Sequence, residues 1–158
     1  MKLGILFATA SLAVLSACFG DPTGARLEIG PPPALPAGTD TVTTASGLKY
    51  ADIIVGTGDV AQANSRVQVH YTLWLSNGSG IETSRGGAPL LFTLGDAGLI
   101  AGFSQGIPGM KEGGTRRLII PPSLGYGSTP QTDASGRVII PANSTLIFDV
   151  ELVSVQPG

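Results

Sequence analysis

The chain is poor in cysteine, histidine and charge. Its 158 residues include one Cys, one His and 13% charged residues, with a formal net charge of -2 and a pI near 5.2. One cysteine cannot form an internal disulfide, and one Cys with one His cannot build a Cys/His zinc site. A nucleic-acid-binding protein normally carries a basic patch, which this composition argues against. We therefore expect no metal site and no nucleic-acid partner.

Glycine and proline are abundant, whereas aromatic residues are few. The chain has 23 Gly, 12 Pro and 6% aromatic residues, and 42% of it is hydrophobic. The hydrophobic fraction is close to that of ordinary globular chains, which excludes disorder throughout. The glycine and proline content favours turns and short strands over long helices. At this length one folded domain is the simplest expectation.

The N-terminus has the pattern of a secretion signal. Lys2 gives a positive start, and residues 3–15 form an uncharged, mostly apolar run. This run is too short to span a bilayer, which takes roughly 20 apolar residues, but it suits a signal-peptide core. The Leu-Ser-Ala-Cys motif at 15–18 resembles the bacterial lipobox, in which the cysteine is acylated and begins the mature protein. A signal peptide with a chance cysteine is the alternative.

We accordingly expect a lipoprotein signal peptide at 1–17, lipid attachment at Cys18, and an extracytoplasmic, membrane-anchored protein on the periplasmic side or cell surface. Residues 19–45 are rich in proline and glycine, with three consecutive prolines at 31–33. This composition predicts a flexible tether over 18–45, with a reach of about 90 Å when fully extended at about 3.3 Å per residue. A strand-bearing segment packed on the domain is the alternative.

From residue 46 onward the hydrophobic pattern predicts strands. Residues 67–75 and 145–152 alternate between apolar and more polar side chains, the period of a half-buried strand, with Tyr71 and Phe148 on the inward faces. Shorter strands are predicted at 48–55, 90–94 and 115–120.

One short helix is predicted between residues 99 and 110. Leu99, Phe103, Ile107 and Met110 share one helical face, while the glycines among them weaken the helix. The fold class expected for 46–158 is therefore α+β, an antiparallel sheet of about five strands whose apolar face is covered by one short helix.

Five sequence stretches in this region carry a family resemblance. They are SGLKY at 46–50, VHYT at 69–72, GMKEGGTRRL at 109–118, IPP at 120–122 with GYG at 125–127, and IIP at 139–141 followed by TLIFDVEL at 145–152. In order and spacing they resemble the FK506-binding-protein (FKBP) family of peptidyl-prolyl cis-trans isomerases. The resemblance implies an FKBP-like fold, isomerase activity without a cofactor, and unfolded or folding proline-containing polypeptides as partners. We expect a monomer, although the sequence itself does not determine the oligomeric state.

The resemblance also implies the residues of the prolyl site. The backbone N–H of Ile100 and the hydroxyl of Tyr126 are the family's usual donors to the bound peptide. Glu82 stands where the family commonly has Asp and acts as a hydrogen-bond acceptor. The full set is Tyr71, Glu82, Phe92, Leu99, Ile100, Phe103, Tyr126, Ile139, Ile140 and Phe148.

Three departures from the family pattern keep a second function open. Ile81-Glu82 replaces the common Phe-Asp, Phe103 stands where Trp is frequent, and the loop at 128–138 differs in composition. These changes favour, as the alternative, a non-catalytic peptide-binding module or chaperone with a degenerate pocket.

Several conspicuous residues are predicted to be ordinary surface groups. His70 falls on the outward face of its strand, with no second histidine to complete a metal or proton-relay site. Arg116 and Arg117 alternate on a strand and are expected to be solvated. One Gly-x-Ser-x-Gly segment occurs, at 102–106, but a Ser-His-Asp hydrolase would need the single histidine, His70, beside its serine, and we predict no such site.

Overall fold

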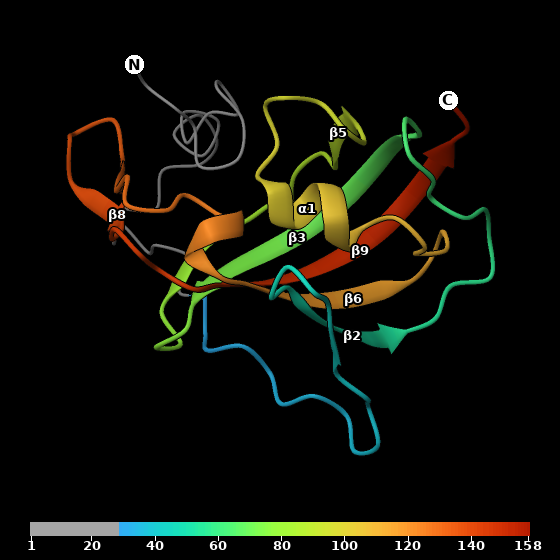
Figure 1. The fold of residues 1–158 in the computed structure, drawn as a ribbon, viewed down its shortest axis with the longest axis horizontal. Helices are drawn as coiled ribbons and strands as arrows, with labels where there is room; N and C mark the ends of the chain where they lie inside the picture. The colour runs from blue at the N-terminus through green and yellow to red at the C-terminus, as the bar shows by residue number, and fades with distance from the viewer. Residues whose placement is uncertain (1–28) are drawn as a thin grey trace.

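The computed structural model describes residues 29–158 (Figure 1). The predicted signal peptide and Cys18 lie outside the described residues. The elements along the chain are the strands β1 (Val42–Thr43), β2 (Lys49–Ile54), β3 (Arg66–Leu75), β4 (Gly80–Thr83) and β5 (Leu90–Thr93), the helix α1 (Ala101–Gly106), the strand β6 (Thr115–Ile120), the 3-10 helix η2 (Pro122–Leu124), and the strands β7 (Gln131–Thr132), β8 (Val138–Ile140) and β9 (Leu146–Gln156).

The strands form an antiparallel sheet with α1 across one face, which confirms the predicted α+β architecture (Figure 1). The sheet has seven strands rather than about five, in the order β1-β2-β6-β9-β3-β4, with β5 pairing with β3. The additional strands, β1 and β4, are too short to show a period in the sequence. The loop at 128–138, which departs from the family composition, contains β7 and leads into β8, and the two strands form a small hairpin.

The helix approaches the sheet closely because two of its six residues are glycines. A Cβ on Gly102 would lie 2.5 Å from the Ile120 side chain, and one on Gly106 would lie 2.6 Å from Leu118. The residues that lower the intrinsic helix propensity therefore permit the packing that holds the helix in place. The predicted apolar face is buried, but only Ala101–Gly106 is helical.

Arg116 is buried, which corrects the prediction that it is solvated. Its guanidinium donates to both carboxylate oxygens of Asp52, at 2.6 and 3.0 Å, and to the carbonyl of Gly106 at 2.8 Å. It also lies 4.4 Å from the centre of the Tyr50 ring. The side chain thus satisfies a carbonyl at the end of α1, where intrahelical partners run out, and joins the helix to β2.

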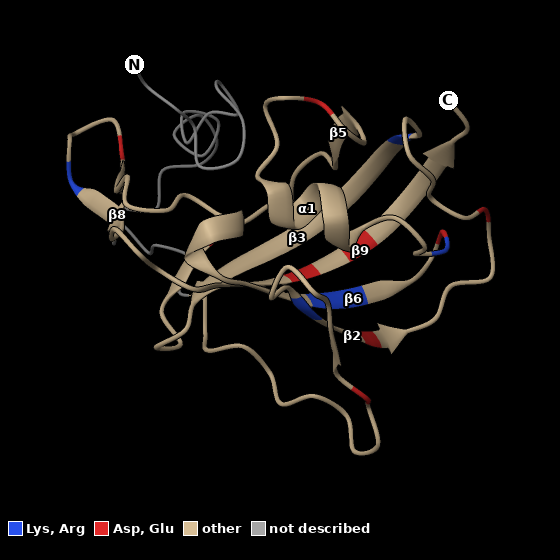
Figure 2. Ribbon diagram, viewed as in Figure 1, with Lys and Arg blue, Asp and Glu red and all other residues tan. Residues whose placement is uncertain are grey.

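Arg117 is also buried, on the opposite face of the sheet, and the prediction is wrong for it as well. It forms a bidentate pair with Asp149 on the neighbouring strand, with both nitrogen–oxygen distances 2.6 Å. Figure 2 shows the blue segment of β6 between red positions on β2 and β9. Alternation along a strand identifies the two faces but not what covers each of them.

The covering element on that second face is the proline-rich segment that was expected to be a free tether. Arg117 donates to the carbonyl of Pro33 at 2.7 Å, and the Trp74 indole N–H donates to the carbonyl of Gly30 at 2.6 Å. Further along, β1 pairs with β2. The segment at 29–45 therefore contacts the domain at both ends, at 30–33 and at β1, as the packed-segment alternative expected, while most of the residues between these ends are exposed.

His70 is only partly exposed, and its Nδ1 lies 3.2 Å from the hydroxyl oxygen of Ser84. Within residues 29–158, no helix is long and apolar enough to cross a membrane.

The buried Arg117–Asp149 pair predicts a large effect of removing one partner. Asp149→Asn leaves the guanidinium buried without a counter-charge, so we expect the free energy of unfolding to fall by about 3 kcal/mol. The matched control is Glu151→Gln on the same strand, which breaks a more exposed pair with Arg85 and should change stability by less than about 1 kcal/mol. Urea unfolding measures both variants, and equal effects would contradict the burial assigned to Arg117.

Candidate active site

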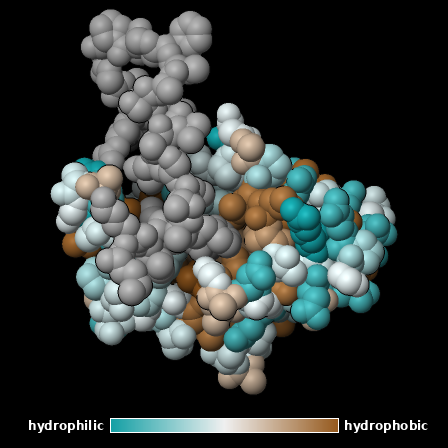
Figure 3. All heavy atoms as spheres, turned by 90° about the horizontal axis from the view of Figure 1, so that it is seen from above, coloured by the Kyte–Doolittle hydropathy of each residue, from teal (hydrophilic) through white to brown (hydrophobic). Residues whose placement is uncertain are grey.

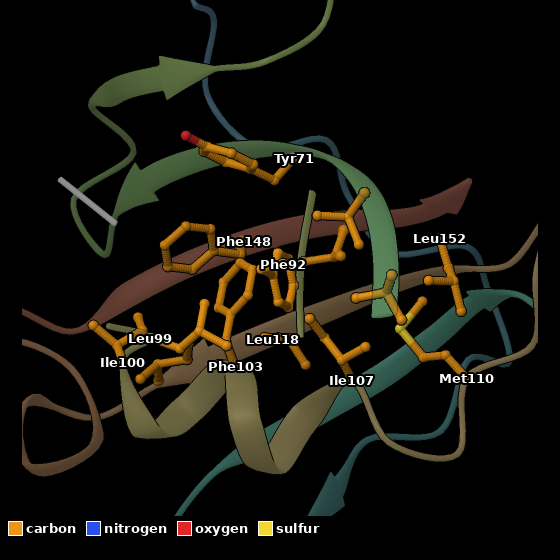
Figure 4. Close-up of a cluster of buried hydrophobic side chains, with 14 of the residues drawn as sticks. Tyr71, Phe92, Leu99, Ile100, Phe103, Ile107, Met110, Leu118, Phe148 and Leu152 are labelled. Atoms are coloured by element: carbon orange, nitrogen blue, oxygen red, sulfur yellow. The ribbon is translucent and has the colours of Figure 1, made fainter. Parts of the chain in front are cut away.

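Four aromatic rings meet between α1 and the sheet (Figure 4). Phe103 extends from the helix and packs edge-on against Phe148 of β9, with ring centroids 4.8 Å apart, and against Tyr71 of β3, at 6.4 Å. Phe92 of β5 lies 6.4 Å from Phe103. The inward placement of Tyr71 and Phe148, predicted from alternation, is confirmed. The four rings form a closely packed, buried apolar cluster between the helix and the sheet.

The start of the helix supplies a second side. Leu99 and Ile100 precede α1 and join the same apolar cluster, but each keeps a small exposed fraction, 9% and 8%. Ile100 has extended backbone angles, φ -65° and ψ 143°. Among the described residues its backbone N–H has no hydrogen-bond partner. This donor therefore lies at the edge of an apolar surface, available to a bound molecule.

The third side comes from the segment between η2 and β8. Tyr126 and Ile139 are partly buried against the cluster, and Ile140 is fully buried in it. Leu124 of η2 packs there too, a contact that the sequence pattern did not identify because a three-residue 3-10 helix has no readable period. The face of the molecule seen in Figure 3 shows hydrophobic residues gathered near its centre, next to a hydrophilic region.

Two polar atoms are buried against this apolar surface without a partner among the described residues. They are Oε2 of Glu82 and the hydroxyl of Tyr126. Buried polar atoms are nearly always hydrogen-bonded, so each such exception requires an explanation. A ligand that supplies a donor to the carboxylate oxygen and an acceptor to the hydroxyl would satisfy both.

The electrostatics of these groups follow from burial and from their proximity. Burial raises the pKa of the Tyr71 and Tyr126 hydroxyls well above the usual 10, and the nearby Glu82 carboxylate raises both further. Burial also raises the pKa of Glu82, against the opposing effect of a hydrogen bond with Tyr71. Both phenols are therefore neutral donors at physiological pH.

The structure thus brings together the ten residues singled out from the sequence. Nine contribute to the apolar cluster or pack against it, and Glu82 interacts with Tyr71 and Tyr126. In residues 29–158 no group of three or more His, Cys, Asp or Glu side chains is placed to hold a metal ion.

Comparison with known proteins assigns this arrangement to a family. Residues 58–153 match the model of the FKBP-type peptidyl-prolyl cis-trans isomerases. The chain belongs to this family. An FK506-binding protein of Neisseria meningitidis is 44% identical over 110 residues, which cover 69% of this chain and 96% of that protein.

Solved structures agree with the assignment of an FKBP fold. The crystal structure of AtFKBP13 superposes with a TM-score of 0.67 and 36% identity, and the match covers 74% of this chain and 99% of that one. The photosynthetic NDH subunit of lumenal location 4 from Arabidopsis thaliana is 39% identical over 72% of this chain. That match covers 55% of the Arabidopsis protein. A second match, to an FK506-binding protein 4 from Neurospora crassa, covers 24% of that protein.

The burial of Glu82 in this FKBP domain predicts a pH-dependent stability. Because its pKa is raised above the ordinary 4.5 in the fold, the stability linked to Glu82 is present below that pH and is lost as pH rises through the folded pKa. Glu82→Gln cannot titrate. The free energy of unfolding of this variant should therefore rise relative to that of the wild type as the pH increases from below 4.5 through the raised pKa of Glu82. Denaturant unfolding across this range measures the difference, and a difference independent of pH would contradict the buried environment.

Proposed function

We propose that this chain accelerates cis–trans isomerisation of Xaa-Pro bonds in polypeptides outside the cytoplasm. The observation that carries the proposal is the group of buried aromatic rings around Phe103, with two unpartnered polar atoms and the free Ile100 N–H beside it. Family membership supports the same activity.

Apolar surroundings suit this reaction because no covalent bond is made or broken. Rotation about the imide destroys the amide resonance, and the barrier is about 18 to 20 kcal/mol. The planar imide carries partial negative charge on oxygen and positive charge on nitrogen, and twisting removes much of that separation. Surroundings that exclude water therefore disfavour the planar state more than the twisted one, which is preferential binding of the transition state.

The polar groups would hold the substrate in the reactive geometry. The Ile100 N–H and the Tyr126 hydroxyl are donors placed on two sides of the apolar cluster, suited to two carbonyl oxygens of a peptide. Glu82 would act as a hydrogen-bond acceptor, and its hydrogen bond with Tyr71 would keep the Tyr71 side chain oriented. The longer side chain of Glu, compared with the Asp common in the family, is expected to alter substrate preference.

The isomerase activity is tested by following the cis-to-trans relaxation of an Ala-Leu-Pro-Phe peptide in an assay without a coupling protease. Micromolar protein should accelerate the relaxation. Tyr126→Phe removes one donor and should lower kcat/KM by about two- to thirteenfold, since a hydrogen bond contributes about 0.5 to 1.5 kcal/mol and 1.36 kcal/mol is tenfold in rate. The matched control is Tyr50→Phe, because Tyr50 lies on β2 against the Arg116 guanidinium and is not one of the ten site residues.

The same assay decides between the two functions considered for this chain. Peptide binding without acceleration would overturn the isomerase proposal in favour of a non-catalytic binding module or chaperone. Equal activity of Tyr126→Phe and Tyr50→Phe would contradict the role assigned to the Tyr126 hydroxyl.

We further propose that Cys18 carries the lipid that anchors the protein to a membrane, as the lipobox-like motif at 15–18 indicates. Extracytoplasmic placement accords with the lumenal location in the name of the Arabidopsis relative. Several acyl chains on one residue would anchor the protein durably, since each buried CH₂ contributes about 0.8 kcal/mol.

Mass spectrometry of the protein's N-terminus tests the anchor. We expect a mature chain that begins at an acylated Cys18, and Cys18→Ser should move the protein from the membrane fraction to the soluble fraction. An unmodified cysteine, or unchanged fractionation of the variant, would contradict lipid attachment.

A further inference from the structure

The face of the sheet opposite α1 carries a second set of organised contacts that the isomerase site does not use. Trp74 and Arg117 lie on β3 and β6, and both are almost fully buried, at 5% and 6% exposed. Each donates one hydrogen bond to a backbone carbonyl of the segment at 29–33, at 2.6 and 2.7 Å. The two donors lie on strands that are separated by β9, so the segment crosses three strands.

This segment has properties that suit docking. Its three consecutive prolines lack N–H donors and favour an extended backbone, so its carbonyls are free to accept hydrogen bonds at little further cost in conformational entropy. An indole and an extended proline-rich chain form a recurrent recognition pair. The Arg117 guanidinium is held in position by Asp149, which leaves Nη1 directed at the Pro33 carbonyl.

A glycine on β4 makes room for the first residue of the segment. A Cβ on Gly80 would come closer than 3.0 Å to Ile29, both to its side chain and to its backbone oxygen. Gly80 lies opposite Trp74 in the β3–β4 register. Ile29 therefore packs beside the indole, and any side chain at position 80 would displace it.

The position of this contact relates the segment to the proposed active site. Glu82 follows Gly80 on the same short strand, two residues along. The segment at 29–33 thus contacts β4, the strand that carries the site residue Glu82. In Figure 1 the blue segment starts beside one end of the sheet, loops away from the sheet and rejoins it at β2.

We propose that residues 29–33 are a docked strap, bound by Trp74, Arg117 and the space above Gly80, which shortens the tether and holds the domain close to its N-terminal anchor. The closeness of the domain to a membrane depends on the proposed lipid at Cys18. A free tether up to residue 45 would reach about 90 Å, whereas the chain from Cys18 to Ile29 reaches at most about 36 Å at about 3.3 Å per residue. The clients favoured by this arrangement are Xaa-Pro segments of chains held at the membrane surface.

Docking can be measured without reference to activity or lipid, because Trp74 is the single tryptophan of the sequence. In the purified Cys18→Ser protein we expect the fluorescence emission of Trp74 to be blue-shifted and to be quenched little by acrylamide. Gly80→Ala should displace Ile29, shift the emission to the red and increase the quenching constant severalfold. The matched control is Gly87→Ala, where the nearest atom to a new Cβ is 3.6 Å away and no positive φ is required.

A second variant keeps the test decisive if Gly80→Ala does not fold. Replacing all three prolines at 31–33 by glycine alters only the strap and should expose Trp74 in the same way. Quenching that is unchanged in both variants, or a wild-type Trp74 already open to acrylamide, would overturn docking.

The shortened tether is tested on the lipidated protein in vesicles. A donor dye on Ala134→Cys, an exposed position of the β7–β8 hairpin, reports the distance to acceptor-labelled lipid by energy transfer. Wild type and Gly87→Ala should show high transfer, and both strap variants should show less. Equal transfer in all four proteins would overturn the short tether. Failure to bind vesicles would overturn the lipid anchor alone, and neither result depends on isomerase activity.

Discussion

The packing of Phe103 against the rings of Tyr71 and Phe148 is the contact on which the proposed site depends. It fixes the position of a helix only six residues long, which could not persist in isolation. It also requires the helix to lie close to the sheet, which Gly102 and Gly106 permit. The same rings are core and site at once, so stability and function cannot be assigned to separate residues here.

The sequence predicted the inner face of the sheet well and the outer face poorly. Alternation identified Tyr71 and Phe148 because both lie on long strands, where several residues define the period. It could not show that Arg117 is buried, since that burial comes from a segment more than eighty positions earlier in the chain. The proline content of that segment predicted a flexible tether and carried no information about what the segment contacts.

The polar residues of the site were also only partly predictable from the sequence. Tyr126 and Glu82 were identified by resemblance to a family, because isolated polar residues in loops and short strands have no periodicity of their own. Their buried, unpartnered oxygen atoms became visible only when the chain was folded. Those atoms distinguish a ligand-binding surface from an ordinary hydrophobic core, where such groups would be costly.

The central claim is that this surface binds a prolyl segment and lowers its rotation barrier in the same event. NMR exchange spectroscopy of a short Xaa-Pro peptide, with the protein present at a small fraction of the peptide concentration, tests it most directly. The account predicts cis–trans exchange peaks on the subsecond timescale, together with shifts of the Ile100 amide and of the Phe103 ring signals. Shifts of these signals without exchange, or exchange that leaves them unmoved, would contradict it.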